Sequence, residues 1–304
     1  MQTLLDAEGL TKRYQGRKAV CSIDFQVVAG ECFGILGPNG AGKTTTLRMV
    51  MGMTPIDGGA LSLFGEKMFP EHPTLRQRIG VVSQEDNLDI DLTVAENLLV
   101  YGRYFGLSDR VITDKMEEML AFAQLEDRGD TKVRTLSGGM KRRLVIARSL
   151  VASPDMIILD EPTTGLDPQA RHLIWQRLRK LKESGVTLVL TTHYMEEAAQ
   201  LCDRLMVLDK GRILDQGSPR ELIERHVEPD VVEIRRVGSY QRPDRKRLDG
   251  LTGRIEPVAD TLLFYTDDTE SLFKRYQGRK HTLLHRPTNL EDVFLKLTGR
   301  ELRD

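Results

Sequence analysis

The stretch "GPNGAGKT" at residues 37–44 has the residue types and the spacing that bind phosphate groups. Its glycines allow the backbone to wrap around phosphates and to point N–H groups at them. The amino group of Lys43 can neutralise terminal phosphate charge, and the Thr44 hydroxyl can bind Mg²⁺. We therefore predict a phosphate-binding loop made of Gly37, Pro38, Asn39, Gly40, Ala41, Gly42, Lys43, Thr44 and Thr45.

Two adjacent carboxylates follow an apolar run in "MIILDEP" at residues 156–162. Asp160, at the end of a buried strand, can hold Mg²⁺ through water, and Glu161 can polarise a water molecule against the γ-phosphate. Carboxylates beside a buried strand are costly unless positive charge meets them there. We predict that this pair serves metal binding and catalysis; the alternative is an acidic turn that ends a strand.

Three further polar residues are candidates, and each has a structural alternative. Gln84 in "GVVSQ" carries an amide suited to contacting both Mg²⁺ and the attacking water, whereas a solvated side chain is the alternative. His193 in "LTTH" ends a strand and is expected to be structural unless that strand neighbours the one leading to the phosphate-binding loop. Asp167 in "TTGLDPQ" directly precedes Pro168, which predicts a helix N-cap.

Aromatic and basic residues give weaker signals. Tyr14 lies upstream of the phosphate-binding loop, where its ring could stack on an adenine or equally pack in the core. The basic run "MKRRL" at residues 140–144 predicts a solvated helix face, and Trp175 is expected in the core. The string "KRYQGRK" occurs at 12–18 and again at 274–280, but the flanking residues differ, so we interpret the repeat as coincidence.

A second phosphate-binding feature occurs in "TLSGGMKRRLVIARSL" at residues 135–150. Ser137, followed by Gly138 and Gly139, predicts the capped start of an amphipathic helix. Unpaired backbone N–H groups and the helix dipole favour an anion at such a start. The chain's own phosphate-binding loop does not need this second site.

Strands and helices must alternate to position these residues. Period-two and buried apolar runs predict strands, and capped amphipathic runs predict helices. This pattern favours an α/β fold with a mostly parallel, doubly wound sheet. We expect one domain over residues 1–228, with an all-helical insert at about 87–152 that starts at a Thr93–Glu96 capping box, and a small α+β domain over 229–304.

Composition and charge are those of an ordinary globular protein. The 304 residues carry a formal net charge of −1, so no global field draws the chain onto nucleic acid or an anionic membrane. The three cysteines, Cys21, Cys32 and Cys202, lack metal-ligand spacing and are expected to be small buried hydrophobes in a reducing compartment. We expect no signal peptide and no membrane span, because no apolar run reaches 18 residues.

The ordered set "GPNGAGKT", "VVSQ", "LSGGM", "MIILDEP", "GLD" and "TTH" resembles the ATP-binding subunit of an ABC transporter over residues 4–226. The resemblance implies ATP and Mg²⁺ as ligands, with an antiparallel β subdomain beside the parallel core. It also implies that Tyr14 stacks on adenine, that Thr44, Gln84 and Asp160 serve the metal, and that Glu161 and His193 are catalytic. Ser137, Gly138, Gly139 and Asp167 would contact nucleotide from a second subunit; Met140 departs from the glutamine of many members.

Longer stretches, including "GGMKRRLVIARSL" and the terminal "NLEDVFLKLTGREL", are similar to ATPase subunits of ABC-2 type exporters, nearest to those of the nodulation type. This resemblance implies a head-to-tail homodimer on the inner face of the cell membrane, with a separate multi-span permease as partner and a lipo-oligosaccharide or lipophilic cargo. In such systems the helical insert docks on the permease.

Two other functions remain as alternatives. A soluble ABC ATPase acting on nucleic acid or the ribosome is disfavoured by the near-neutral charge and by a single ATPase cassette. A nucleotide-sensing module with little turnover, regulated by residues after 228, is disfavoured by the presence of Glu161 and His193.

Overall fold

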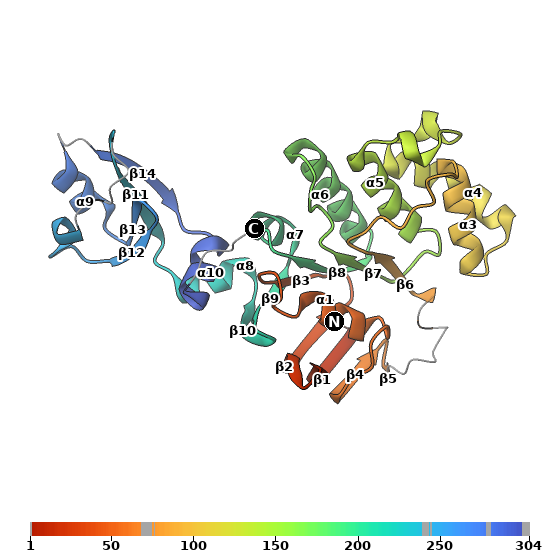
Figure 1. The fold of residues 1–304 in the computed structure, drawn as a ribbon, viewed down its shortest axis with the longest axis horizontal. Coiled ribbons are helices and arrows are strands. Elements are labelled where there is room, and N and C mark those ends of the chain that lie inside the picture. Colours follow the sequence, from red (N-terminus) through yellow and green to blue (C-terminus); the bar gives the residue numbers. More distant parts are fainter. Residues whose placement is uncertain are drawn as a thin grey trace. The chain divides into compact units, whose positions relative to one another are not determined.

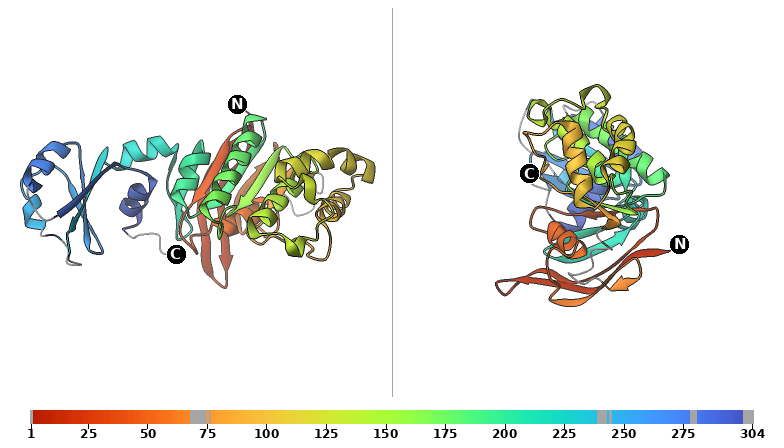
Figure 2. Two further views of the ribbon diagram at one scale, coloured as in Figure 1. Left: turned by 90° about the horizontal axis from the view of Figure 1, so that it is seen from above. Right: turned by 90° about the vertical axis from the view of Figure 1, so that its right-hand side faces the viewer.

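The computed structural model describes residues 2–67, 75, 77–238, 243, 245–277 and 281–299, and it contains two compact units. Unit 1 spans Met1–Gln216 and unit 2 spans Gly217–Asp304 (Figures 1 and 2). The boundary between the two units therefore lies after Gln216, whereas we expected from the sequence that it lies after residue 228. Helix α8 (Pro219–His226) accounts for the difference, because it packs on α10 (Leu290–Thr298) in unit 2.

A six-stranded sheet in the order β10-β9-β3-β8-β7-β6 forms the centre of unit 1. The pairs β3–β8, β3–β9, β6–β7 and β7–β8 are parallel, so the carboxyl ends of these strands meet at one edge, where α/β folds bind ligands. The strands are β3 (Cys32–Leu36), β6 (Ile79–Val82), β7 (Met156–Asp160), β8 (Thr187–Thr192), β9 (Arg204–Asp209) and β10 (Arg212–Gly217).

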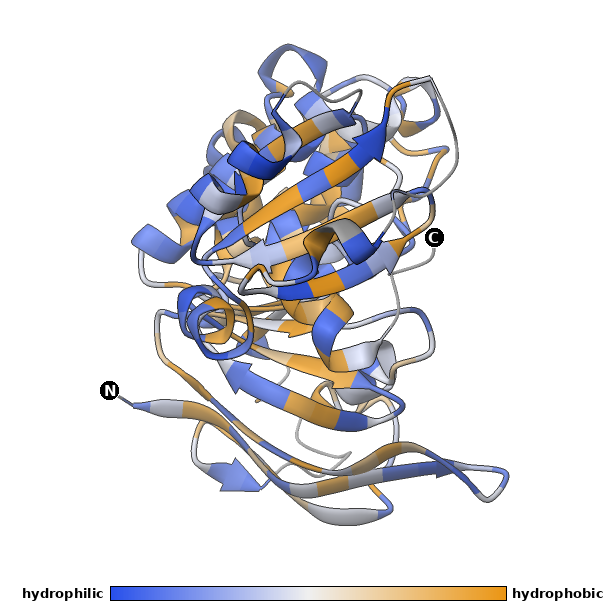
Figure 3. Ribbon diagram, turned by 90° about the vertical axis from the view of Figure 1, so that its left-hand side faces the viewer, coloured by the Kyte–Doolittle hydropathy of each residue, from blue (hydrophilic) through white to orange (hydrophobic). Residues whose placement is uncertain are grey.

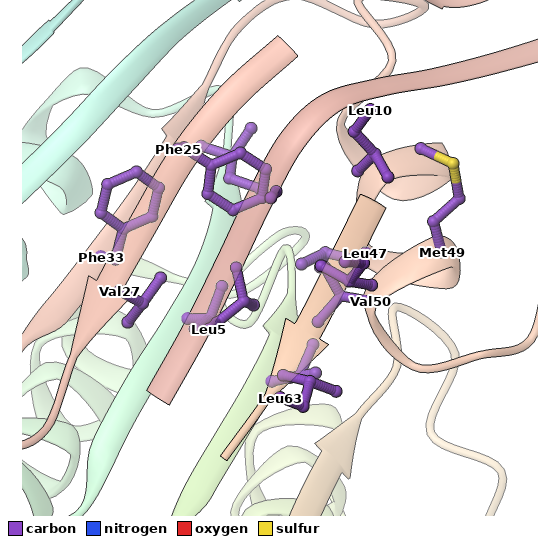
Figure 4. Packing of buried hydrophobic residues seen from close by; sticks show 14 of the residues in the cluster. Leu5, Leu10, Phe25, Val27, Phe33, Leu47, Met49, Val50 and Leu63 are labelled. Carbon is purple, nitrogen blue, oxygen red and sulfur yellow. The ribbon is translucent and has the colours of Figure 1, made fainter. Parts of the chain in front are cut away.

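An antiparallel sheet in the order β2-β1-β4-β5 packs across helix α1 (Lys43–Val50) from the central sheet (Figure 1). Its strands are β1 (Thr3–Tyr14), β2 (Arg17–Val28), β4 (Gly58–Leu63) and β5 (Glu66–Lys67). Buried residues alternate along β2, which is the period expected of a strand with one apolar face. Leu5, Phe25, Phe33, Leu47 and Leu63 meet in the shared core (Figure 4).

Helices α3 (Val94–Tyr104), α4 (Asp109–Ala123) and α5 (Gly138–Ser149) lie together at one end of unit 1 around their own apolar cluster (Figures 1 and 2). The predicted capping box of Thr93 and Glu96 is present at the start of α3. Helices α6 (Pro168–Glu183) and α7 (Met195–Leu201) cover the face of the central sheet opposite α1 (Figure 1). In the described part of the chain, no helix is both long and apolar enough to cross a bilayer.

Unit 2 is an antiparallel sheet in the order β12-β13-β11-β14, accompanied by three helices. Apolar residues occur in succession along its central strands (Figure 3), and successive residues point to opposite faces of the sheet. One face packs Leu272 and Tyr276 of α9, and the other face packs Leu295 of α10. The elements are α8 (Pro219–His226), β11 (Asp230–Arg236), β12 (Arg254–Val258), β13 (Thr261–Thr266), α9 (Thr269–Tyr276), β14 (His281–Pro287) and α10 (Leu290–Thr298). Both units confirm the predicted fold class.

Candidate active site

The phosphate-binding loop joins β3 to α1, so it lies at the carboxyl edge of the central sheet. At Gly37 a Cβ atom would lie 2.2 Å from the carbonyl oxygen of Leu208, and Gly42 adopts a φ of +109°. Only glycine satisfies both conditions without distortion. Lys43 is buried and donates hydrogen bonds from Nζ to the carbonyl oxygens of Gly37 (2.9 Å) and Pro38 (3.2 Å). The amino group of Lys43 therefore binds the backbone of its own loop.

Asp160, the last residue of β7, lies beside the first turn of α1 because β7 and β3 both neighbour β8. Its Oδ1 accepts hydrogen bonds from the hydroxyl groups of Thr44 (3.3 Å) and Thr191 (2.5 Å). Two oxygen ligands of the kind that Mg²⁺ prefers are thus already adjacent. Among the described residues, no group of three or more His, Cys, Asp or Glu could hold a metal ion, so a bound Mg²⁺ would take further ligands from phosphate and water.

Glu161 connects the lysine to the histidine. Its Oε1 lies 3.2 Å from Nζ of Lys43, and its Oε2 lies 3.2 Å from Nδ1 of His193. The contact with His193 and then the charge of Lys43 lower the pKa of Glu161 to about 2, despite burial that opposes ionisation. Thr164 also donates its hydroxyl to Oε2, at 3.1 Å. The carboxylate is therefore ionised and held in place by partners on three segments.

The backbone of Glu161 is in the left-handed region, with a φ of +48°. For a residue with a long side chain this conformation costs about 1–2 kcal/mol. The N–H group of Glu161 donates to both the carbonyl and the hydroxyl oxygen of Thr191, each at 3.1 Å. The surrounding hydrogen bonds thus stabilise a backbone turn that aims the carboxylate toward Lys43.

His193 directly follows β8, and β8 pairs with β3, the strand that leads to the phosphate-binding loop. From the sequence we expected a functional His193 only if its strand neighbours the one leading to the loop, and the two strands are neighbours. The His193 ring lies 4.2 Å from the ring of Tyr194, centroid to centroid, and its side chain is 15% exposed. The structure therefore brings together Lys43, Asp160, Glu161 and His193.

Tyr14 and Gln84 lie at the surface. Tyr14 ends β1 and is 46% exposed, with Nζ of Lys12 at 5.5 Å from its ring centroid, so its ring is open to a ligand and is not core. Gln84 follows β6, and the contact described for it is through its carbonyl oxygen, 3.4 Å from Nη1 of Arg142. No described contact joins the Gln84 side chain to Asp160 or Glu161.

The start of α5 lines a different surface. Ser137 caps this helix, and its hydroxyl accepts from the N–H of Met140 at 3.3 Å; Asp167 caps α6 in the same way, accepting from Ala170 at 2.9 Å. Both caps line one open groove of about 480 Å³ together with Gly138 and Gly139. No residue of the phosphate-binding loop lines this groove. One chain thus presents two separate surfaces suited to phosphate.

Two buried charged residues near the site were not found from the sequence. The prediction that "MKRRL" forms a solvated face is wrong for Arg142, which is 5% exposed. Arg142, Val145 and Ile146 share the helical spacing of an inward face, and that spacing could have revealed it. Glu197 on α7 is fully buried, and its Oε1 accepts from Thr163 (2.7 Å) and from the indole N–H of Trp175 (3.0 Å). Burial raises the pKa of Glu197.

Known protein families match parts of both units. The ABC transporter family matches residues 20–164, and the C-terminal domain of nodulation factor export protein NodI matches residues 241–299. Among solved structures, cbiO1 from Clostridium perfringens, part of the ABC transporter complex cbiONQ, has a TM-score of 0.69 at 29% identity, covering 74% of this chain and 92% of that one. A cassette solved as a dimer in a post-hydrolysis state with ADP and Pi has a TM-score of 0.64 at 29% identity, covering 71% of this chain and 98% of that one.

Full-length relatives extend the match over both units. The Nod factor export ATP-binding protein I of Ralstonia nicotianae is 53% identical over 308 residues, which is 99% of this chain and 95% of the relative. The protein of the same name from Cupriavidus metallidurans is 51% identical over 305 residues and 100% of both chains. The chain therefore belongs to the ABC transporter ATP-binding family, within its nodulation-type export group.

Proposed function

We propose that this ATP-hydrolysing exporter subunit works as a head-to-tail pair of identical chains. Each ATP would lie between the phosphate-binding loop of one copy and residues 137–139 of the other. The observation that carries the proposal is the groove at Ser137 and Asp167, a phosphate-suited helix start to which the chain's own loop contributes no residue. A two-fold pair completes two such sites at once. The dimeric structural relative with ADP and Pi supports this arrangement.

Hydrolysis would begin when the phosphates of ATP take Lys43 away from Glu161. His193 and then Lys43 hold the pKa of Glu161 low, so losing the lysine would remove one of these contacts and raise the basicity of the carboxylate as a water molecule arrives. His193, 3.2 Å from the same carboxylate, would orient it and the γ-phosphate. Gln84 is proposed to approach the attacking water once the loop that follows β6 moves.

Thr44 and Asp160 would hold Mg²⁺, with Gln84 as a further ligand, and the ion would neutralise charge on the transferred phosphate. The exposed ring of Tyr14 would stack on the adenine. The loop would also contribute backbone N–H groups or contacts from Asn39, Ala41 and Thr45. Pro38 has no N–H to donate, so it would contribute contacts alone.

The membrane partner is proposed to be a multi-span permease of the ABC-2 type, with the ATPase peripheral on the cytoplasmic face of the membrane. The cargo is proposed to be a lipo-oligosaccharide, because the full-length relatives are named for Nod factor export. The same relatives favour an exporter over a soluble ATPase acting on nucleic acid.

Glu161→Gln tests the proposal directly. The variant should bind ATP, hydrolyse it barely, and accumulate as a dimer in ATP but not in ADP, as measured by sedimentation. Normal turnover in this variant would falsify the role of Glu161. Co-purification with ribosomes or DNA in place of a membrane protein would support the soluble alternative.

A further inference from the structure

Arg142 is a buried guanidinium on the helix that carries the proposed nucleotide contacts of Ser137 to Gly139. Helix α5 begins directly after Ser137, and Arg142 lies just over one turn farther along, 5% exposed. Charged side chains are rarely buried to this extent unless each donor has a partner. The partners of Arg142 therefore indicate what the side chain is for.

Its five hydrogen bonds run to backbone carbonyl oxygens of two loops, and Nη1 also lies 3.7 Å from the Asp86 carboxylate in the loop after β6. Toward the loop after β7, Nη2 donates to Asp160 and Glu161, each at 3.2 Å, and Nε donates to Pro162 at 2.6 Å. Toward the loop after β6, Nη1 donates to Ser83 at 2.5 Å and to Gln84 at 3.4 Å. One planar fork thus joins the segment of the catalytic carboxylate to the segment of the predicted water-contacting glutamine.

This fork completes the support of the strained turn at Glu161. The N–H group of Glu161 is held by Thr191, and its carbonyl oxygen is held by Arg142. Because the left-handed turn persists only while its surroundings fix it, losing the Arg142 bond frees one end of the turn. The carboxylate would then lose its aim toward Lys43 and the attacking water.

We infer that Arg142 is a positioning residue that couples the two nucleotide sites of the pair. The inference rests on the proposed head-to-tail function. In that arrangement the start of α5 contacts the partner copy's ATP, while Arg142 on the same helix sets Glu161 and Gln84 at the chain's own ATP. Contact between α5 and the partner copy's ATP thereby positions Glu161 and Gln84 for hydrolysis of the chain's own ATP.

The test compares Arg142→Gln and Arg142→Lys with Arg148→Gln in the full chain. Arg148 is a matched control: it is a buried arginine on the same helix that donates to the carbonyl oxygens of Asn87 (2.8 Å) and Asp86 (3.2 Å), but not to residues 160–162. For each variant the readouts are kcat, the KM for ATP, the Hill coefficient for ATP, and Tm.

We expect Arg142→Gln to lower kcat about tenfold or more and to bring the Hill coefficient to about 1, with KM changed less than about twofold. Arg142→Lys should be intermediate, because an ammonium group cannot bridge both loops as a fork does. Arg148→Gln should keep the Hill coefficient and keep kcat within about twofold of the unaltered chain.

Unaltered kcat and Hill coefficient in either folded Arg142 variant overturn the inference. An equal loss of kcat and of the Hill coefficient in Arg148→Gln would also overturn the inference, because it would indicate a general effect of helix packing. If Arg142→Gln does not fold, Arg142→Lys decides; if neither folds, the residue serves stability and the inference fails. Glu161→Gln in the same assay distinguishes a failure of the proposed function from a failure of the inference about Arg142. Normal turnover in Glu161→Gln would overturn the proposed function.

Discussion

In the proposed mechanism the phosphates of the nucleotide draw Lys43 away from Glu161, and this separation should have a measurable cost. Glu161→Gln removes the charge at 3.2 Å from Nζ of Lys43 and should therefore tighten nucleotide binding. His193 and then Lys43 are the contacts that lower the pKa of Glu161 from 4.5 to about 2. Breaking one charge-assisted contact of this kind costs about 1.5 kcal/mol, so its absence in the variant should lower the Kd about tenfold.

The assay is calorimetric titration with ADP, at protein concentrations where the chain is monomeric. ADP still engages the loop lysine but places no γ-phosphate against position 161, so charge repulsion with that phosphate does not contribute. Asp155→Asn is the control, because it removes a comparable but exposed ion pair with Arg78 and should leave the Kd unchanged. An ADP affinity in Glu161→Gln equal to or weaker than that of the unaltered chain would refute the reasoning.

Three further predictions concern the same unit. The Glu161 contacts stabilise the fold above pH 4.5, and this stabilisation is lost as the pH falls toward 2; the difference in unfolding free energy between the unaltered chain and Glu161→Gln should therefore shrink as urea titrations move to lower pH. Tyr14→Ala should raise the Kd for ATP about tenfold while Tyr14→Phe does not, since stacking needs only the ring; equal effects would contradict a stacking role. Gly37→Ala would place a Cβ 2.2 Å from the Leu208 carbonyl oxygen, so it should lower the unfolding free energy by about 1–3 kcal/mol in urea titrations and abolish ATP binding; unaltered stability would show that the loop can shift.

The local signals of the sequence predicted much of the fold. Helix caps are fixed by short-range hydrogen bonds, and the predicted caps at Thr93, Ser137 and Asp167 are all present. The buried strand ending at Asp160 was equally clear, because a parallel strand covered on both faces is a continuous apolar run.

Elements whose pattern is weak were missed. Strand β14 and helix α9 were not predicted, and α9 contains the start of the second "KRYQGRK". The first copy forms the end of β1, a turn and the start of β2, whereas Lys274, Arg275 and Tyr276 of the second copy are helical. Residues 278–280 lie outside the described residues. Tertiary packing thus overrides local propensity here, which agrees with a coincidental repeat.

In the candidate site too, some residues could be identified from the sequence and others could not. Lys43, Asp160 and Glu161 could be named from motifs because each ends or follows an element of clear pattern. Arg142 could not be assigned a role, because it donates to backbone carbonyls of distant loops, and such bonds leave no trace in residue types. Glu197 could not be assigned one either, because the side chains of Thr163 and Trp175 reach it only through the tertiary fold. The half-buried Cys21 likewise differs from the buried Cys32 and Cys202 for reasons of tertiary position.

If each ATP lies between two different chains, two inactive variants with complementary defects should restore each other's activity when mixed. Lys43→Ala impairs the phosphate-binding loop, and Ser137→Arg blocks the start of α5, so either variant alone should be inactive. A mixed pair contains one site with both defects and one site with none. With random pairing, half of the dimers are mixed and carry one intact site of two, so independent sites would regain about a quarter of the unaltered ATPase rate. Coupling through Arg142 would lower the regained rate by up to about tenfold, but the mixture should still exceed either variant alone. A mixture that stays inactive, although both variants fold and associate, would contradict the account.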